Sequence, residues 1–210
     1  MVHLEKHNSK LWENVDSPPQ IIVRMAKESL YEWQFMQKAK QHCQTPLSAV
    51  TWEKPPPTSL KCNVDCALFN NNFITGYGFC FRDFSGQFVT GLSNFEPSSS
   101  SLAEAEALGL FKAVQFAIDK NMFSVVFESD SKFVVDMINF AFVPHNETGD
   151  IISRCKNLLA ARNNYTVRHV RRQANRVAHT IARASLSHPS PHIFSDVPDY
   201  LYSLIIIEMA

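Results

Sequence analysis

Acidic side chains occur in three segments of the chain where a buried carboxylate would need a partner. Asp65 lies within an apolar run over 61–69 that is typical of a buried strand. Glu106, with Glu104 beside it, lies in the first turn of an apolar helical segment, and Asp130 follows a short β-rich run. Three carboxylates brought together would repel one another unless a cation lay between them. Their convergence would therefore indicate a metal site.

The kind of metal follows from the donor atoms. Ligand sets made only of oxygen favour hard ions such as Mg²⁺ or Mn²⁺. Two such ions can hold both the attacking and the leaving oxygen of a phosphodiester displacement. Each acid also has a simpler interpretation: Asp65 can be a solvated residue at a strand end, Asp130 a helix cap, and Glu104 and Glu106 partners of the helix dipole. The residues alone leave both interpretations open.

A mixed α/β sheet would bring these acids together. The periodicity predicts strands over 61–69, 73–82, 87–94, 123–128 and 165–170, and helices over 102–120, 133–138, 151–159 and 173–186. Three strands in a meander followed by α/β alternation imply a mixed sheet with helices on its faces. The first and fourth strands would be parallel neighbours, and sites form at such strand ends.

The two ends of the chain differ from this central pattern. Apolar residues over 21–41 recur with helical spacing, and three consecutive prolines at 55–57 form a stiff connector. We therefore expect an N-terminal extension over 1–58 that contains an amphipathic helix and a Pro-rich linker. The core domain is expected over 59–187, and a C-terminal tail over 188–210.

Composition excludes several classes of protein. The 210 residues are 45% hydrophobic, which is globular, and the net charge is zero, so any basic surface must be local. The first ten residues have no apolar core, and the longest apolar run near the C-terminus is too short to span a bilayer. The five cysteines show no paired spacing. We expect an intracellular protein, nuclear or cytoplasmic, with reduced cysteines, no signal peptide and no membrane partner.

Four motifs in a fixed order carry a resemblance to a known family. They are Asn-Val-Asp-Cys-Ala at 63–67, Ala-Glu-Ala-Leu at 105–108, Glu-Ser-Asp-Ser at 128–131 and the Arg- and His-rich stretch at 168–179. Together they resemble the RNase H-type domain of plant reverse-transcriptase-like proteins, which is related to the RNase H of non-LTR retrotransposons. The resemblance implies an RNase H-like fold, with a five-stranded mixed sheet whose second strand is antiparallel.

The resemblance also implies an activity and roles for residues. It implies a metal-dependent endoribonuclease that hydrolyses the RNA strand of RNA/DNA hybrids with two Mg²⁺ (or Mn²⁺) ions. Asp65, Glu106 and Asp130 match the family's first three metal-binding acids, and the Ala-Glu-x-x-x-Leu frame favours Glu106 over Glu104. His169 matches a histidine that moves protons and helps product release.

Two positions depart from the family pattern. His179 stands where the family usually has a fourth metal-binding acid, and imidazole is a poor Mg²⁺ ligand. Cys66 stands where glycine is usual, and glycine permits close approaches that cysteine resists. We therefore expect a weakened second metal site and reduced activity.

A local basic cluster lies in the last motif. Such clusters are commonly solvated faces, but beside a phosphodiester site this one would contact phosphates. The expected nucleic-acid-binding residues are Arg168, Arg171, Arg172, Asn175 and Arg176. The expected partner is an RNA/DNA hybrid, told from DNA by its 2′-hydroxyls, and the protein is expected to be a monomer.

Two other functions stay open. The departures at Cys66 and His179 would suit a nucleic-acid-binding domain that keeps the fold without catalysis. Alternatively, the helix around Trp33 and the apolar segment 200–207 could be docking surfaces of an interaction scaffold.

Overall fold

The computed structural model describes residues 51–69, 73–97, 101–140, 143 and 146–209, together with Val23 and Leu30. The chain divides into two compact units, Met1–Thr45 and Pro46–Ala210. The helix expected over 21–41, with Trp33, lies outside the described residues apart from Val23 and Leu30. Every strand of the described residues lies in the second unit.

The second unit is an α/β domain built on a six-stranded mixed sheet. The strand order is β5-β4-β1-β2-β3-β6. The strands are β1 (Leu60–Phe69), β2 (Ile74–Arg82), β3 (Phe88–Pro97), β4 (Val125–Ser129), β5 (Tyr165–His169) and β6 (His192–Phe194). β2 is antiparallel to both β1 and β3, whereas β4 is parallel to β1 and β5. The predicted parallel pairing of the first and fourth strands is confirmed.

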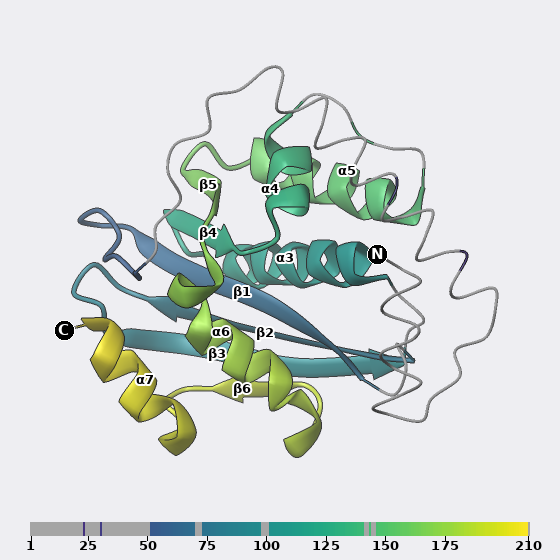
Figure 1. Ribbon diagram of the computed structural model, residues 1–210. Coiled ribbons are helices and arrows are strands. Elements are labelled where there is room, and N and C mark those ends of the chain that lie inside the picture. The colour runs from purple at the N-terminus through teal and green to yellow at the C-terminus, as the bar shows by residue number, and fades with distance from the viewer. Residues whose placement is uncertain are drawn as a thin grey trace. The chain divides into compact units, whose positions relative to one another are not determined.

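Helices cover both faces of the sheet (Figure 1). The helices are α3 (Leu102–Asp119), α4 (Lys132–Asn139), α5 (Glu147–Ala160), α6 (Arg176–Arg183) and α7 (Asp199–Met209). α3, α4 and α5 lie on one face, and α6 and α7 lie on the other. Within the described residues, no helix has both the length and the apolar character needed to cross a membrane.

An aromatic cluster forms the core beneath α3. Phe79 and Phe81 of β2 contact Phe116 of α3, with ring centroids 5.3 and 5.7 Å away. Phe127 of β4 extends the cluster to Tyr165 of β5, at 5.4 Å. Rings of this size dominate the apolar area that a small domain can bury. The cluster therefore holds α3, and with it Glu106, against β1, β2 and β4.

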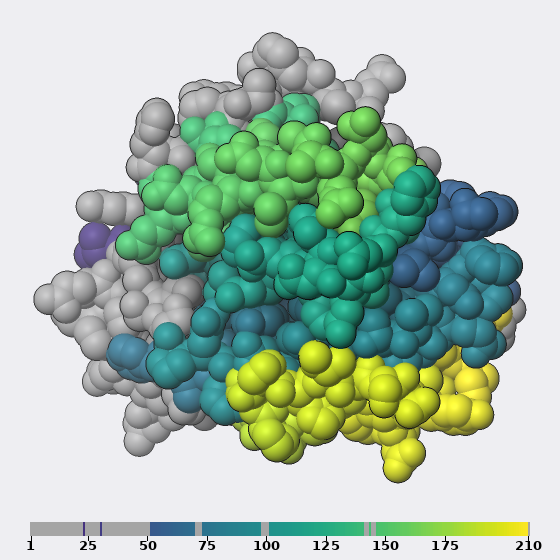
Figure 2. Space-filling view, turned by 180° about the vertical axis from the view of Figure 1, so that it is seen from behind, coloured from purple at the N-terminus to yellow at the C-terminus, as the bar shows by residue number. Residues whose placement is uncertain are grey.

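The C-terminal residues complete the opposite face, which corrects the expectation of a tail over 188–210. β6 pairs antiparallel with β3 and adds the sixth strand. Leu201 and Ile205 of α7 are buried against Cys80 of β2 and Ile181 of α6. In Figure 2 the yellow C-terminal residues lie directly against the rest of the domain. The apolar side chains that suggested docking over 200–207 are thus partly used in the domain's own core.

The Pro-rich lead-in is also part of the domain. Trp52 is 6% exposed, and its indole Nε1 donates to Asn63 Oδ1 of β1 at 2.8 Å. The expected boundary at 58/59 therefore falls inside a packed segment, and the second unit begins at Pro46.

Two glycines allow α6 to approach the sheet closely. A Cβ atom on Gly78 of β2 would lie 2.5 Å from the backbone nitrogen of Ala182, and one on Gly76 would lie 3.2 Å from the Ala182 carbonyl oxygen. Real Cβ atoms do not come as close as 2.5 Å to backbone, so α6 would have to move outward. Since α6 carries His179, the close approach that these glycines allow places this histidine within hydrogen-bonding distance of Asp65.

We expect Gly78→Ala to lower the free energy of unfolding by about 1–3 kcal/mol, the usual cost of overpacking. Urea unfolding would measure it. Gly109→Ala in α3 is the matched control, because its Cβ would lie 3.5 Å from its nearest neighbours, in ordinary contact. Alanine in a helix interior is favoured over glycine by up to about 1 kcal/mol, so this control should be neutral or stabilising. Equal losses for the two variants would contradict the close-approach argument.

Candidate active site

Asp65 is a buried acid on β1. It is 3% exposed and lies opposite Gly78 of β2. Its Oδ1 accepts from the backbone N–H of Cys66 at 2.7 Å, and its Oδ2 lies 2.9 Å from His179 Nδ1. Asp65 is therefore not a solvated residue at a strand end.

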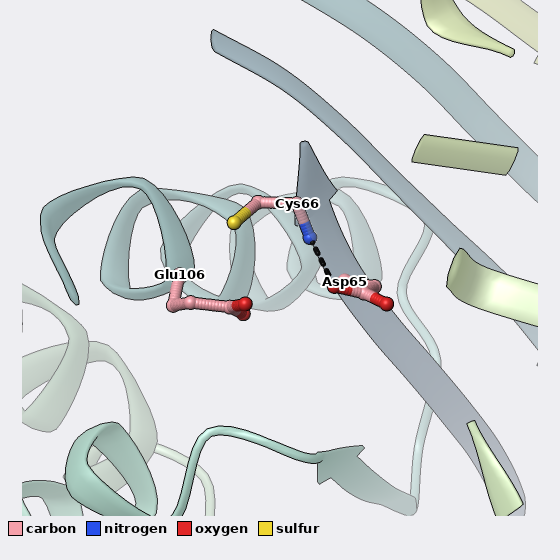
Figure 3. Close-up of side chains that lie close together, drawn as sticks. All are labelled: Asp65, Cys66 and Glu106. Carbon is pink, nitrogen blue, oxygen red and sulfur yellow. Dashed lines mark hydrogen bonds between the residues drawn. The ribbon is translucent and has the colours of Figure 1, made fainter. Parts of the chain in front are cut away.

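Glu106 comes to the same place from α3. Ser101 and Glu104 form a capping box that begins this helix. Glu104 is thus used at the cap, while Glu106 is 8% exposed and buried toward the sheet. Ligand atoms of Asp65, Cys66 and Glu106 lie within 4.8 Å of one another. Figure 3 shows the Glu106 carboxylate directed toward Asp65.

Burial and mutual repulsion raise the pKa of both acids. The pKa of Asp65 rises from 3.8 to about 7, first because of burial and then because of the Asp130 charge. Burial raises the pKa of Glu106 well above its ordinary value, with further contributions from Asp65 and Asp130. The charge of Arg172 and hydrogen bonds from Cys66 oppose these shifts only in part. In the metal-free site the protonated acids are therefore favoured. A bound cation would favour the ionised carboxylates instead.

Asp130 lies at the end of β4, outside the 4.8 Å group but close enough to act on both acids. Its Oδ1 accepts from Asn175 Nδ2 at 3.2 Å, and the same nitrogen donates to the Val64 carbonyl of β1 at 3.0 Å. Asn175 thus joins the end of β4 to β1. The structure therefore places Asp130, at the end of β4, near Asp65, which lies in the middle of the neighbouring strand β1, and near Glu106 of α3.

His179 uses both of its ring nitrogens within the protein. Its Nε2 lies 3.1 Å from Arg172 Nη2, and guanidinium groups only donate. Nε2 must therefore accept, so Nδ1 carries the proton and donates to Asp65 Oδ2. Burial and the Arg172 charge lower the pKa of His179, which agrees with a neutral ring. In this arrangement both ring nitrogens of His179 are engaged within the protein.

His169 lies beside Asp130 at the end of β5. Its side chain is half-buried and hydrogen-bonds to the Asp130 backbone. Burial, followed by the Lys132 charge, lowers the pKa of His169 from its ordinary 6.5. A neutral imidazole at the edge of the acid cluster can accept a proton.

The expected nucleic-acid-binding residues of the last motif divide into two groups by their exposure. The four arginines are exposed: Arg168, Arg171, Arg172 and Arg176. Asn175, in contrast, is 1% exposed, and both hydrogens of its amide donate within the protein. Both amide hydrogens of Asn175 are therefore used within the protein.

Sequence reasoning missed a buried polar network behind the site. Asn63 stands at its centre, and Arg82 and Glu208 belong to it. The charged residues were not recognisable as buried, because each stands at the end of an element, where charges are normally solvated. The only signal was Trp52, a large aromatic residue in an otherwise polar and Pro-rich lead-in.

The raised pKa of Asp65 predicts how the stability of the metal-free protein depends on pH. Between its ordinary pKa of 3.8 and its folded pKa of about 7, the folded state keeps a proton that the unfolded state has lost. The contribution of Asp65 is thus fully present below pH 3.8 and is lost as the pH rises through about 7. In Asp65→Asn the free energy of unfolding should decline less steeply with rising pH. Urea unfolding in the presence of EDTA would measure this dependence. Asp119→Asn, at the exposed end of α3, should keep it; an unchanged slope in Asp65→Asn would contradict the assignment.

Comparison with known proteins supports a family. Residues 63–185 match the model of the reverse transcriptase-like family. A protein of Arabidopsis thaliana named "Putative ribonuclease H protein" is 27% identical over 157 residues, which are 74% of this chain. The chain spans only 25% of the length of that relative.

Solved structures of RNase H1 proteins share the fold. The enzyme of Halobacterium salinarum superimposes with a TM-score of 0.57 at 20% identity, over 61% of this chain and 98% of that one. The compost-derived LC11-RNase H1, solved in complex with an RNA/DNA hybrid, gives a TM-score of 0.54 at 18% identity, over 61% and 96%. The expected RNase H-like fold is confirmed, with a sixth strand beyond the expected five. The chain belongs to the reverse transcriptase-like family and carries an RNase H-type domain.

Proposed function

We propose that this domain is a divalent-metal-dependent endoribonuclease that hydrolyses the RNA strand of RNA/DNA hybrids. The supporting observation is that Asp65, Glu106 and Asp130 come from three separate elements, and that the charge of Asp130 raises the pKa of both Asp65 and Glu106. A relative of the same fold was solved with an RNA/DNA hybrid bound, and the proposed substrate is of that class.

The residues present fit a hard cation. Glu106 is buried with only the Cys66 thiol as its hydrogen-bonding partner among the contacts that set its pKa, so its carboxylate oxygens are available. Burial raises the pKa of Cys66 well above its ordinary value, so this thiol stays neutral beside the acids. When bound, Mg²⁺ or Mn²⁺, two ions in this proposal, would stabilise charge on the attacked phosphate and activate a water. Asp65, Glu106 and Asp130 would hold the ions.

The second ion would be held weakly. In the family pattern a fourth acid completes its site, whereas here His179 is neutral and engaged by Arg172 and Asp65. Affinity for hard ions depends on the number of charged oxygen ligands, so loss of one carboxylate lowers it. Mn²⁺, which accepts nitrogen more readily than Mg²⁺, should support activity better.

His169 and the exposed arginines would serve the substrate. We assign His169 as a group that accepts a proton during the reaction, since burial and the Lys132 charge lower its pKa and it lies beside Asp130. Arg168, Arg171 and Arg176 are exposed around it and would contact phosphates. These contacts carry no sequence information, so discrimination of hybrid from DNA would depend on 2′-hydroxyls.

One observation favours a second candidate, a nucleic-acid-binding domain without catalysis. His179 donates to Asp65 Oδ2, so an ion that used this oxygen would compete with the histidine. In that case the domain would bind hybrids through its arginines and cleave none of them.

We expect Asp65→Asn to abolish cleavage of a labelled RNA/DNA hybrid in Mg²⁺ and in Mn²⁺, because a neutral amide cannot replace the negative charge of the carboxylate. Asp119→Asn should cleave like the wild-type protein. Thermal unfolding of both variants would show that the fold is kept. Equal cleavage by Asp65→Asn would contradict the proposed site, and binding without cleavage by the wild-type protein would support the second candidate.

We expect Arg171→Gln to weaken hybrid binding and to reduce the slope of log affinity against log salt by about one, the value for one lost phosphate contact. Fluorescence anisotropy over a salt series would measure this slope. Arg154→Gln is the control, because the guanidinium of Arg154 on α5 lies over the Phe111 ring of α3 and is used within the protein. If both variants kept the wild-type slope, Arg171 would not lie at the interface.

A further inference from the structure

Four charged side chains are buried together behind the candidate active site. Lys61, Arg82 and Glu128 are at most 6% exposed, and the Glu208 side chain is also 6% exposed. Lys61 Nζ lies 2.6 Å from Glu128 Oε1, and Arg82 Nη1 lies 2.7 Å from Glu208 Oε2. Two cations face two anions, so the network is electrically balanced.

Arg82 joins both flanks of the domain. Its guanidinium, 0% exposed, lies over the Trp52 ring at 3.6 Å from the centroid. Its partner Glu208 lies in the last turn of α7. The lead-in before β1 and the C-terminal helix therefore meet at a single buried cation on β2.

Asn63 connects this cation to the acids. Its Oδ1 accepts from Arg82 Nη2 at 3.2 Å and from Trp52 Nε1 at 2.8 Å. Its Nδ2 lies 3.1 Å from Glu128 Oε2 and 3.2 Å from Asn175 Oδ1. Since Asn175 donates to Asp130, an unbroken series of side-chain contacts runs from α7 to the third acid.

Such a network is not explained by stability. Replacing a buried ion pair with apolar residues of similar volume is often neutral or stabilising, whereas removal of one partner is strongly destabilising. Polar networks instead fix one geometry through their hydrogen bonds. Here Asn63 supplies these bonds, while Arg82 and Glu208 are held together by charge, since Arg82 Nη1 and both Glu208 carboxylate oxygens form no hydrogen bond within the described residues. Trp52 and Glu208 also lie outside the segment 63–185 that matches the family, so the matched segment alone would leave Arg82 without its counter-ion.

We infer that Trp52 and Glu208 are positioning residues for the candidate metal site, acting on Asp130 through Arg82, Asn63 and Asn175. This inference rests on the proposed function. The working unit of the domain then includes both Trp52 and Glu208. Through this series α7 sets the orientation of Asp130, although the two are joined only through other side chains. Glu208 holds Arg82, Arg82 orients the Asn63 amide, and that amide fixes the Asn175 side chain that holds Asp130.

The experiment compares Glu208→Gln with the wild-type protein, because glutamine keeps the shape and removes the charge. The first readout is the side-chain amide resonances of Asn63 and Asn175 in NMR spectra of the metal-free protein. The second is Mn²⁺ affinity measured by calorimetry. We expect shifted amide resonances and a roughly three- to tenfold weaker Mn²⁺ affinity, the range of coupling through a contiguous network. Ile207→Ala, an exposed neighbour on α7, should change neither.

A double-mutant cycle separates positioning from general destabilisation. In an Asn175→Ala background, Glu208→Gln should cause no further loss of Mn²⁺ affinity, since the route to Asp130 is already broken. Unmoved Asn175 resonances in Glu208→Gln, or additive losses in the cycle, would overturn the inference. Failure of the wild-type protein to bind Mn²⁺, with the resonances shifted, would instead contradict the proposed metal site.

Discussion

The repulsion between buried carboxylates is the constraint on which this domain depends. Asp65 and Glu106 are held within 4.8 Å, inside the protein and near a third acid. Without a cation this arrangement costs free energy, as the raised pKa of both groups shows. The fold must therefore supply rigid elements that keep the acids together, and the aromatic cluster between α3 and the sheet does so.

Two polar systems meet at Asn175. On one side the acids carry an excess of negative charge, offset in part by Arg172. On the other side Lys61, Arg82, Glu128 and Glu208 balance one another. A balanced network exerts little net field on the acids, so it can fix the position of Asp130 without neutralising it. Because the balanced network is separate from the acids, the negative charge of the acids remains available to a cationic ligand.

Sequence patterns identified the acids because their surroundings were informative. Asp65 interrupts an apolar run, and the Ala-Glu-x-x-x-Leu frame of the resembled family favoured Glu106 over Glu104. The same reasoning missed β6, which has three residues and no alternation to detect. It also treated α7 as a tail, because its apolar side chains show no single face. The proton position on His179 could not be predicted, since it depends on Arg172, seven residues earlier in the chain.

The two departures from the family pattern act on the metal-free protein by different means. His179 replaces a charged ligand by a neutral donor to Asp65, which removes one source of repulsion. Cys66 adds a neutral thiol that hydrogen-bonds to Glu106, and burial keeps this thiol protonated. Cys66 thus adds support without charge, while His179 removes charge. Both changes lower the free-energy cost of the metal-free site. The change at His179 does so by removing a negative charge, which also lowers the attraction for a second ion. In this chain, stability without metal and affinity for metal are therefore opposed at a single residue, His179.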